Sequence, residues 1–228
     1  MKLADPGAAD QLRAGQLALD EGDWEAARCC FEAVLERDPT PEAWEGLGWV
    51  GWWLADAELT FRAREEAFRA YRAAGDALGA ARIATSLAAD FREFRGDVAT
   101  GRGWMERAYR LLEGAGEASE RGWLVLNDAD CSLNVDRDFG RTLELASEGE
   151  RLGRRLGSPD LEAVSLALCG SARVGLGELE RGMRDLEEAA ATVLGSVCNP
   201  SPRAGRCAAS SPPATTSATS AGRATGAR

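Results

Sequence analysis

The 228-residue sequence predicts an all-α protein built from tandem helical hairpins. Three observations carry this prediction. Short turn sequences recur at a nearly constant spacing, apolar residues between them repeat at helical intervals, and strong helix formers such as Ala, Leu, Glu and Arg dominate the composition. Few β-branched residues interrupt the pattern, so we expect almost no β-strand.

One set of turns holds a Gly, Ala or Arg followed by an acidic residue. Its members begin at positions 22, 55, 96, 137 and 177, so successive turns are 33, 41, 41 and 40 residues apart. A second set lies between them, at 38–41, 75–76, 114–116 and 157–159. Each period therefore holds two helices of ordinary length, and residues 8–194 are predicted to form about five helical hairpins.

The stretches between turns are amphipathic. Ala27, Phe31, Val34 and Leu35 follow an i, i+4, i+7, i+8 pattern, and the stretches 105–112 and 179–189 show similar stripes. Small residues recur at matching points, and we expect them to let paired helices approach to about 8–10 Å. These residues are Gly15, Gly48, Ala88, Ala129 and Gly170 in the first helices and Ala27, Gly101, Gly182 and Ala189 in the second.

Two short motifs resemble the tetratricopeptide repeat. Trp44-x-x-Leu47-Gly48 matches the signature of its first helix, and Ala27-x-x-x-Phe31 followed by Pro39 matches that of its second, although Gly51 stands where the family prefers Tyr. The resemblance implies a tetratricopeptide-like, right-handed superhelical solenoid. A HEAT-like array, whose period is also near 40 residues, is the alternative.

Four segments, at 44–53, 75–82, 107–112 and 149–157, look like the MalT-like repeat region of bacterial LuxR-type transcriptional regulators. That resemblance implies a regulatory or sensor region that binds a protein, a peptide or a small-molecule effector. In the family a helix-turn-helix domain follows, and we expect this chain to be truncated before it. The alternative is a generic tetratricopeptide adaptor that assembles a complex unrelated to transcription.

Composition argues for binding rather than catalysis. The sequence has no His, and its single Lys is Lys2, so triads with His, common zinc sites and Walker A loops are excluded. We expect no enzyme activity, no catalytic residue, no cofactor and no bound metal. Asn134, Asp136 and Asp138 superficially resemble a calcium loop, but Phe139 stands where that loop needs Gly, which favours a polar turn.

The charge distribution separates the two parts of the chain. The formal net charge is −10, and residues 195–228 contain four Arg and no acidic residue, which leaves −14 on residues 1–194. Such a surface repels phosphate, so we expect no nucleic-acid binding. The N-terminus shows no signal sequence and the stretch 46–57 is too short to span a bilayer, so we expect a cytoplasmic protein without membrane contact.

The two ends are predicted to be less ordered. Residues 1–7 are expected to form a flexible N-terminus, and residues 195–228 a disordered low-complexity tail. The abrupt loss of acidic and large apolar residues suggests a reading-frame change near codon 194, with an ordinary disordered tail as the alternative. The helix at 178–194 would then present an uncapped apolar stripe through which the chain could self-associate.

The partner-binding residues are predicted from helix register. Three Trp residues crowd one first helix, and exposed Trp is a favoured anchor in interfaces. The alternatives are that these Trp residues pack between hairpins and that the polar residues are plain solvated surface. The predicted residues of a concave groove are Trp49, Trp52, Trp53, Gln16, Asp20, Arg92, Glu93, Asp130 and Asn134.

Overall fold

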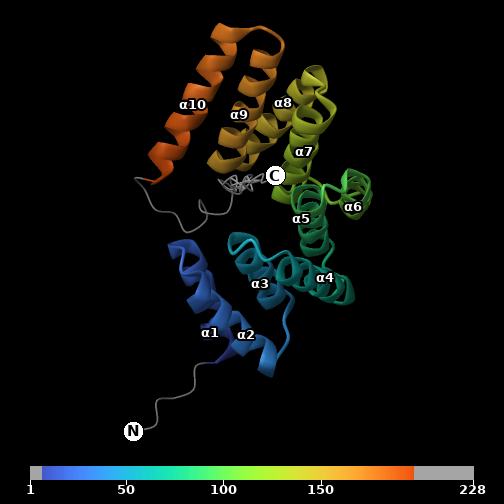
Figure 1. Cartoon of the computed structure of the whole chain (residues 1–228), viewed down its shortest axis with the longest axis vertical. Helices are drawn as coiled ribbons and strands as arrows, with labels where there is room; N and C mark the ends of the chain where they lie inside the picture. The colour runs from blue at the N-terminus through green and yellow to red at the C-terminus, as the bar shows by residue number, and fades with distance from the viewer. Residues whose placement is uncertain (1–6, 198–228) are drawn as a thin grey trace, which may run out of the picture.

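The structure, a computed structural model, describes residues 7–197 of the chain, with side chains up to residue 192 (Figure 1). Over this range the backbone forms ten α-helices and one short π-helical segment, with no β-strand. The elements are α1 (Ala8–Glu21), α2 (Trp24–Arg37), α3 (Pro41–Trp53), α4 (Ala57–Ala73), α5 (Ala77–Arg95), α6 (Val98–Leu111), α7 (Ser119–Cys131), η1 (Ser132–Asp136), α8 (Phe139–Leu156), α9 (Pro159–Gly175) and α10 (Leu179–Val197).

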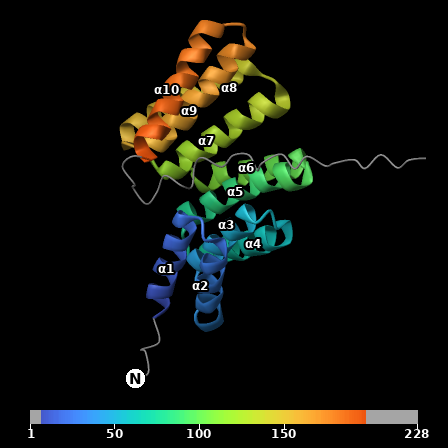
Figure 2. The same ribbon diagram turned by 60° about the vertical axis from the view of Figure 1, so that its left-hand side comes forward.

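The helices pair in chain order into five hairpins, which are α1–α2, α3–α4, α5–α6, α7–α8 and α9–α10. Each hairpin packs on the next through its second helix and the following first helix, although α6 makes only a small contact with α7. First helices also touch each other at α1–α3, α5–α7 and α7–α9. The hairpins are therefore stacked in sequence order along the long axis of the molecule (Figures 1 and 2).

The turn inside each hairpin repeats one local design. A residue with positive φ ends the first helix, at Gly22, Ala55, Gly96, Arg137 and Gly177. In the first four hairpins the next residue is an Asp whose carboxylate accepts a hydrogen bond from the backbone N–H three residues later, at 2.9–3.0 Å. This N-cap satisfies a donor that the new helix leaves free. The five turns predicted from the sequence are thus confirmed.

Small residues bring the two helices of a hairpin close together. A Cβ built on Gly51 of α3 would lie 2.7 Å from the backbone nitrogen of Thr60 in α4. Likewise, a Cβ on Gly170 of α9 would lie 2.8 Å from the carbonyl oxygen of Gly182 in α10. Any larger side chain would push these backbones apart. Gly51, where the tetratricopeptide family prefers Tyr, therefore has its own packing reason.

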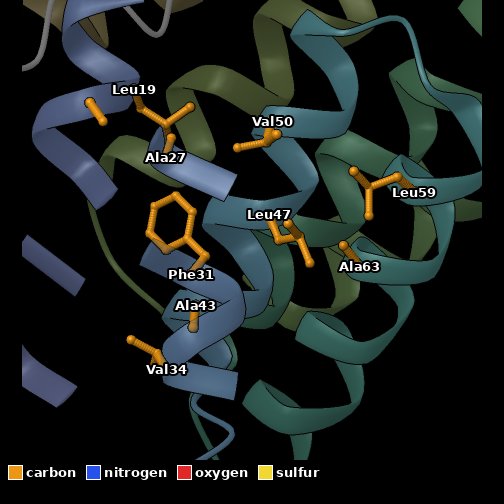
Figure 3. Packing of buried hydrophobic residues seen from close by; sticks show 10 residues of the cluster. Leu19, Ala27, Phe31, Val34, Ala43, Leu47, Val50, Leu59 and Ala63 are labelled. Carbon is orange, nitrogen blue, oxygen red and sulfur yellow. The ribbon is translucent and has the colours of Figure 1, made fainter. Parts of the chain in front are cut away.

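The core follows the stack rather than forming one central mass. Its first part joins α1 to α4 around Phe31, which is 1% exposed and lies against Gly15 (Figure 3). The predicted stripe residues Ala27, Phe31 and Val34 all belong to this cluster. Further clusters follow along α4 to α7 and then α7 to α9. Each hairpin consequently depends on its neighbours to bury its apolar face.

The all-helical fold class is confirmed over the described residues. Two details were not predicted: α10 continues to Val197, beyond the expected boundary at 194, and α7 ends in the π-helical segment η1. The predicted tail beyond Val197, with its reading-frame hypothesis, and the first six residues lie outside the described range. Among residues 7–197, no helix has both the length and the apolar character needed to cross a membrane.

Candidate interaction surface

A polar network joins the starts of three successive first helices. Thr40 caps α3 and Asp76 caps α5, so Glu45 and Arg82 both fall in the early turns of their helices, and Glu120 lies in the first turn of α7. Arg82 donates to both Glu45 carboxylate oxygens at 2.8 Å and to Glu120 Oε1 at 3.0 Å. One guanidinium therefore links three hairpins.

Tyr71 of α4 completes this network. Its hydroxyl donates to Glu45 Oε2 at 2.7 Å and accepts a hydrogen bond from Arg82 Nη2 at 3.2 Å. Burial alone would raise the pKa of Glu45, but its bonds to Arg82 and Tyr71 outweigh that effect and lower the pKa. Hydrogen bonding to Glu45 raises the pKa of Arg82, and burial raises that of Tyr71. At neutral pH, Glu45 and Arg82 are therefore both charged and the Tyr71 phenol is neutral.

A second network lies further along the same pair of first helices. Arg92 of α5 contacts Asp130 of α7 at 2.6 Å and Glu93 at 3.1 Å, and the Asn134 amide donates to Asp130 at 2.7 Å. The side chains of Arg92 and Asp130 are 12% and 22% exposed. Four residues predicted from helix register are therefore brought together here. We call the residues of the two networks on α3, α5 and α7 the first-helix face: Glu45, Arg82, Glu120, Arg92, Glu93, Asp130 and Asn134.

The other predicted residues are placed apart from these networks. Gln16 donates to Asp20 at 3.0 Å within α1. Trp52 is 8% exposed and packs edge-on against Phe94, so it is a packing residue rather than a contact surface. Trp52 does not reach the predicted groove because α5 of the following hairpin covers it.

Trp49 and Trp53 also have partners inside the chain. The guanidinium of Arg64 lies 4.5 Å from the centre of the Trp49 ring. Trp53 stacks on Trp24 of α2 with ring centres 4.9 Å apart, although 37% of the residue stays exposed. Trp49, Trp52 and Trp53 therefore serve three different contacts and do not form one patch.

The stripe on α7 carries an aromatic residue that the sequence analysis did not select. Glu120, Trp123, Asn127 and Asp130 follow one another at spacings of three and four residues, which places them on one side of α7, and Asn134 of η1 continues this row through its hydrogen bond to Asp130. Trp123 is half-buried against the core cluster of α7 to α9. We call these five residues the α7 stripe. Along the helix, Trp123 lies between Glu120 and Asn127, three residues after the first and four before the second.

A buried ion pair lies behind the first-helix face. Arg64 of α4 and Asp90 of α5 have side chains only 1% and 2% exposed, and their Nε and Oδ2 atoms lie 2.6 Å apart. Gly48 makes room for the stem of Arg64, because a Cβ there would lie 2.9 Å from Arg64 Cγ. Among the described residues, Nε and Nη1 of Arg64 and Oδ2 of Asp90 make no hydrogen bond of good geometry, so the contact is a close ion pair rather than an aligned hydrogen bond. Despite the adjacent cation, burial raises the pKa of Asp90 to about 6.

Neither the Glu45–Arg82 network nor the Arg64–Asp90 pair was predicted. The sequence feature that could have indicated the Glu45–Arg82 network is the alternation of charge at Glu45, Arg82 and Glu120, which are 37 and 38 residues apart. Arg64 gave no signal, because an Arg in a polar helix is normally solvated.

A cavity of about 10 Å³ between α5, α6 and α7 is the size of a single water. In residues 7–197 no group of three or more Asp, Glu or Cys side chains is placed to hold a metal ion. The two networks can present fixed charges to a partner.

Comparison with known proteins gives a fold-level likeness. No model of a known protein family matches the chain, and no curated protein sequence matches it either. Among solved structures the chain is similar to BtubC (BKLC) from P. vanneervenii, with a TM-score of 0.63 and 15% sequence identity. The match covers 86% of this chain and 83% of that one. At this identity the likeness concerns the fold alone.

Proposed function

We propose that this protein is a helical-repeat scaffold, rather than an enzyme, that binds a basic peptide segment of a partner protein. The contact surface is the first-helix face together with the α7 stripe. The observation that carries the proposal is that inter-hairpin ion pairs hold Glu120 and Asp130 in place on the side of α7 that also carries the half-buried Trp123. An aromatic ring within a rim of fixed polar groups is the usual composition of an interaction hot spot.

The charge of the surface selects the partner. Glu45, Arg82 and Glu120 together carry one net negative charge, and so do Arg92, Glu93 and Asp130. This excess of carboxylates, on a chain with a formal net charge of −10, favours Lys and Arg side chains in the partner and disfavours nucleic acid.

The fold supports an elongated binding surface. First helices contact each other at α1–α3, α5–α7 and α7–α9, which supports this proposal. We propose the right-handed superhelical solenoid that the Trp44 and Phe31 motifs imply. In such a solenoid the first helices line the concave side. Small-angle scattering that fits a compact bundle instead would argue against this geometry.

The regulatory context rests on the sequence resemblance to LuxR-type regulators. We propose that the scaffold acts as the sensor region of such a regulator, with a generic adaptor as the alternative. A helix-turn-helix coding segment in the same gene or in an adjacent reading frame would favour the regulator.

Panning a displayed library of random peptides against the whole chain tests the binding role. We expect the recovered peptides to be rich in Lys and Arg and to bind less tightly to the Glu120→Gln/Asp130→Asn variant. A matched control is Glu65→Gln/Glu66→Gln, which removes the same charge from α4. Recovery of acidic peptides, or equal weakening by both double variants, would contradict the proposal.

A further inference from the structure

One contact recurs at two of the four junctions between neighbouring hairpins. The first residue of a second helix packs near the end of the following first helix: Trp24 of α2 stacks on Trp53 of α3. In the same way the Phe139 ring of α8 lies against Gly175 of α9. One helical turn further along, Phe61 of α4 packs on Phe91 of α5 with ring centres 4.7 Å apart.

The last second helix carries apolar residues at the same two positions, but no side chain of residues 7–192 covers them. Leu179 begins α10 as Trp24 begins α2 and Phe139 begins α8, and Met183 follows four residues later, as Phe61 follows Ala57. Leu179 is 60% exposed and Met183 is 50% exposed. We call these two residues the α10 end.

The first helix of the chain shows the complementary gap. Leu17 lies five residues before the positive-φ residue Gly22 and is 57% exposed. The residues at the same place in α3 and α9 are Val50 and Ala172, and both are 0% exposed because a preceding hairpin covers that side. No hairpin precedes α1 in the described structure, so Leu17 is left in solvent. We call this position the α1 end.

From these two unfilled halves of one repeated contact, we infer that the chain associates head to tail with a second copy of itself. The α1 end of one copy occupies the α10 end of the other, as a sixth first helix would. Residues 198–228 contain no Leu, Ile, Val, Met, Phe, Tyr or Trp, so their sequence offers no large apolar side chain that matches this position. The occupant must present an apolar side chain to Met183. Leu17 of α1 does so, because it lies five residues before its turn, as Phe91, the partner of Phe61, lies before Gly96, although Asp20 stands where Trp53 and Gly175 meet the first residue of a second helix.

The geometry fixes the kind of assembly. Two different surfaces meet, so the contact is heterologous and each added copy exposes a new free end. The apolar patch is small, so we expect weak association, with a dissociation constant on the order of 100 μM. Salt strengthens it, because screening reduces repulsion between chains of net charge −10.

The test uses light scattering and sedimentation of the full chain up to about 1 mM, a range that brackets the expected affinity. Leu179→Gln/Met183→Gln blocks the α10 end, and Leu17→Gln blocks the α1 end. Leu78→Gln is the control, since Leu78 is 37% exposed in the first turn of α5, away from both ends. Circular dichroism verifies that every variant keeps its helical content.

Head-to-tail association predicts species larger than a dimer for the natural chain and the Leu78→Gln control, and a monomer for either end variant alone. An equimolar mixture of the two end variants forms a dimer and nothing larger, because each supplies the end that the other lacks. Two results would overturn the inference: a natural chain that is monomeric throughout, or a Leu17→Gln variant that still dimerises, which would indicate contact between two α10 helices. Peptide binding on the first-helix face is unaffected by these variants, so the two proposals fail independently.

Discussion

The Arg64–Asp90 pair allows the sharpest prediction about stability. Both side chains are almost fully buried, and Nε and Oδ2 lie 2.6 Å apart. Arg64→Met removes the cation, keeps most of the apolar stem that fills the space beside Gly48, and leaves Asp90 buried without a counter-charge. Arg64→Met/Asp90→Val removes both charges and keeps the site filled.

The magnitudes follow from this geometry. At 2.6 Å and an effective dielectric constant of about 20, the attraction between the charges is about 6 kcal/mol. The burial of two ions costs several kcal/mol each, so the pair as a whole contributes little net stability. Loss of one partner is different, because the remaining charge keeps its desolvation cost. We expect Arg64→Met to lower the free energy of unfolding by about 3–5 kcal/mol near pH 7, and the double variant to recover most of that loss.

The pH dependence gives this prediction a sign. Burial raises the pKa of Asp90 to about 6, above its unfolded value of about 3.9. The folded chain therefore binds the proton more tightly than the unfolded chain between about pH 4 and 6, and acidification through this window favours folding at this site. Without Arg64 the folded pKa rises further, so the deficit of Arg64→Met shrinks as the pH falls from 7 to 5. The double variant has no such titration.

Urea denaturation at pH 7 and pH 5 measures these differences. Arg69→Met is the control, because its ion pair with Glu66 is solvent-exposed and should contribute less than about 1 kcal/mol. The reasoning would be refuted by a loss below about 1 kcal/mol for Arg64→Met at pH 7, or by a double variant as unstable as the single one.

Two further predictions concern the hairpins. Gly51→Ala places a Cβ 2.7 Å from the Thr60 nitrogen, so we expect thermal unfolding to show a free energy of unfolding lower by about 1–3 kcal/mol. The control Gly103→Ala meets nothing within 4 Å and should stabilise α6 by about 0.5–1 kcal/mol, so equal effects of the two variants would contradict the close approach. Asp56→Ala removes the N-cap of α4 and should cost about 1 kcal/mol in urea unfolding, with Asp56→Asn close to the natural chain; a neutral Asp56→Ala would show that the cap is dispensable.

Local features of the fold could be predicted because their causes are local. A positive-φ residue followed by Asp, as at Gly22 and Gly96, ends one helix and caps the next whatever lies around it. The period of such turns indicates the number of hairpins. Ala55 and Arg137 also adopt positive φ without being Gly, and only their place in the period identified them.

For residues that pair between hairpins, the sequence predicted the side of the helix on which some of them lie, but not their partners. Arg92, Asp130 and Asn134 were found because helix register places them on one side of their helices. Which carboxylate meets which guanidinium depends on how far one hairpin shifts against the next, and a single sequence does not encode that shift visibly. Arg64 is the clearest case, because its burial depends jointly on Gly48, Trp49 and Asp90 across three helices.

The measurement that tests the central proposal most directly compares two Trp variants in their affinity for a recovered basic peptide. Trp123 and Trp104 are both half-buried, but Trp123 lies in the α7 stripe whereas Trp104 packs on Phe68 in the second-helix layer. Isothermal titration calorimetry should show that Trp123→Ala weakens binding at least tenfold, about 1.4 kcal/mol, while Trp104→Ala, verified as folded, binds like the natural chain. Unchanged affinity in Trp123→Ala, or a larger loss in Trp104→Ala, would contradict binding on the first-helix face.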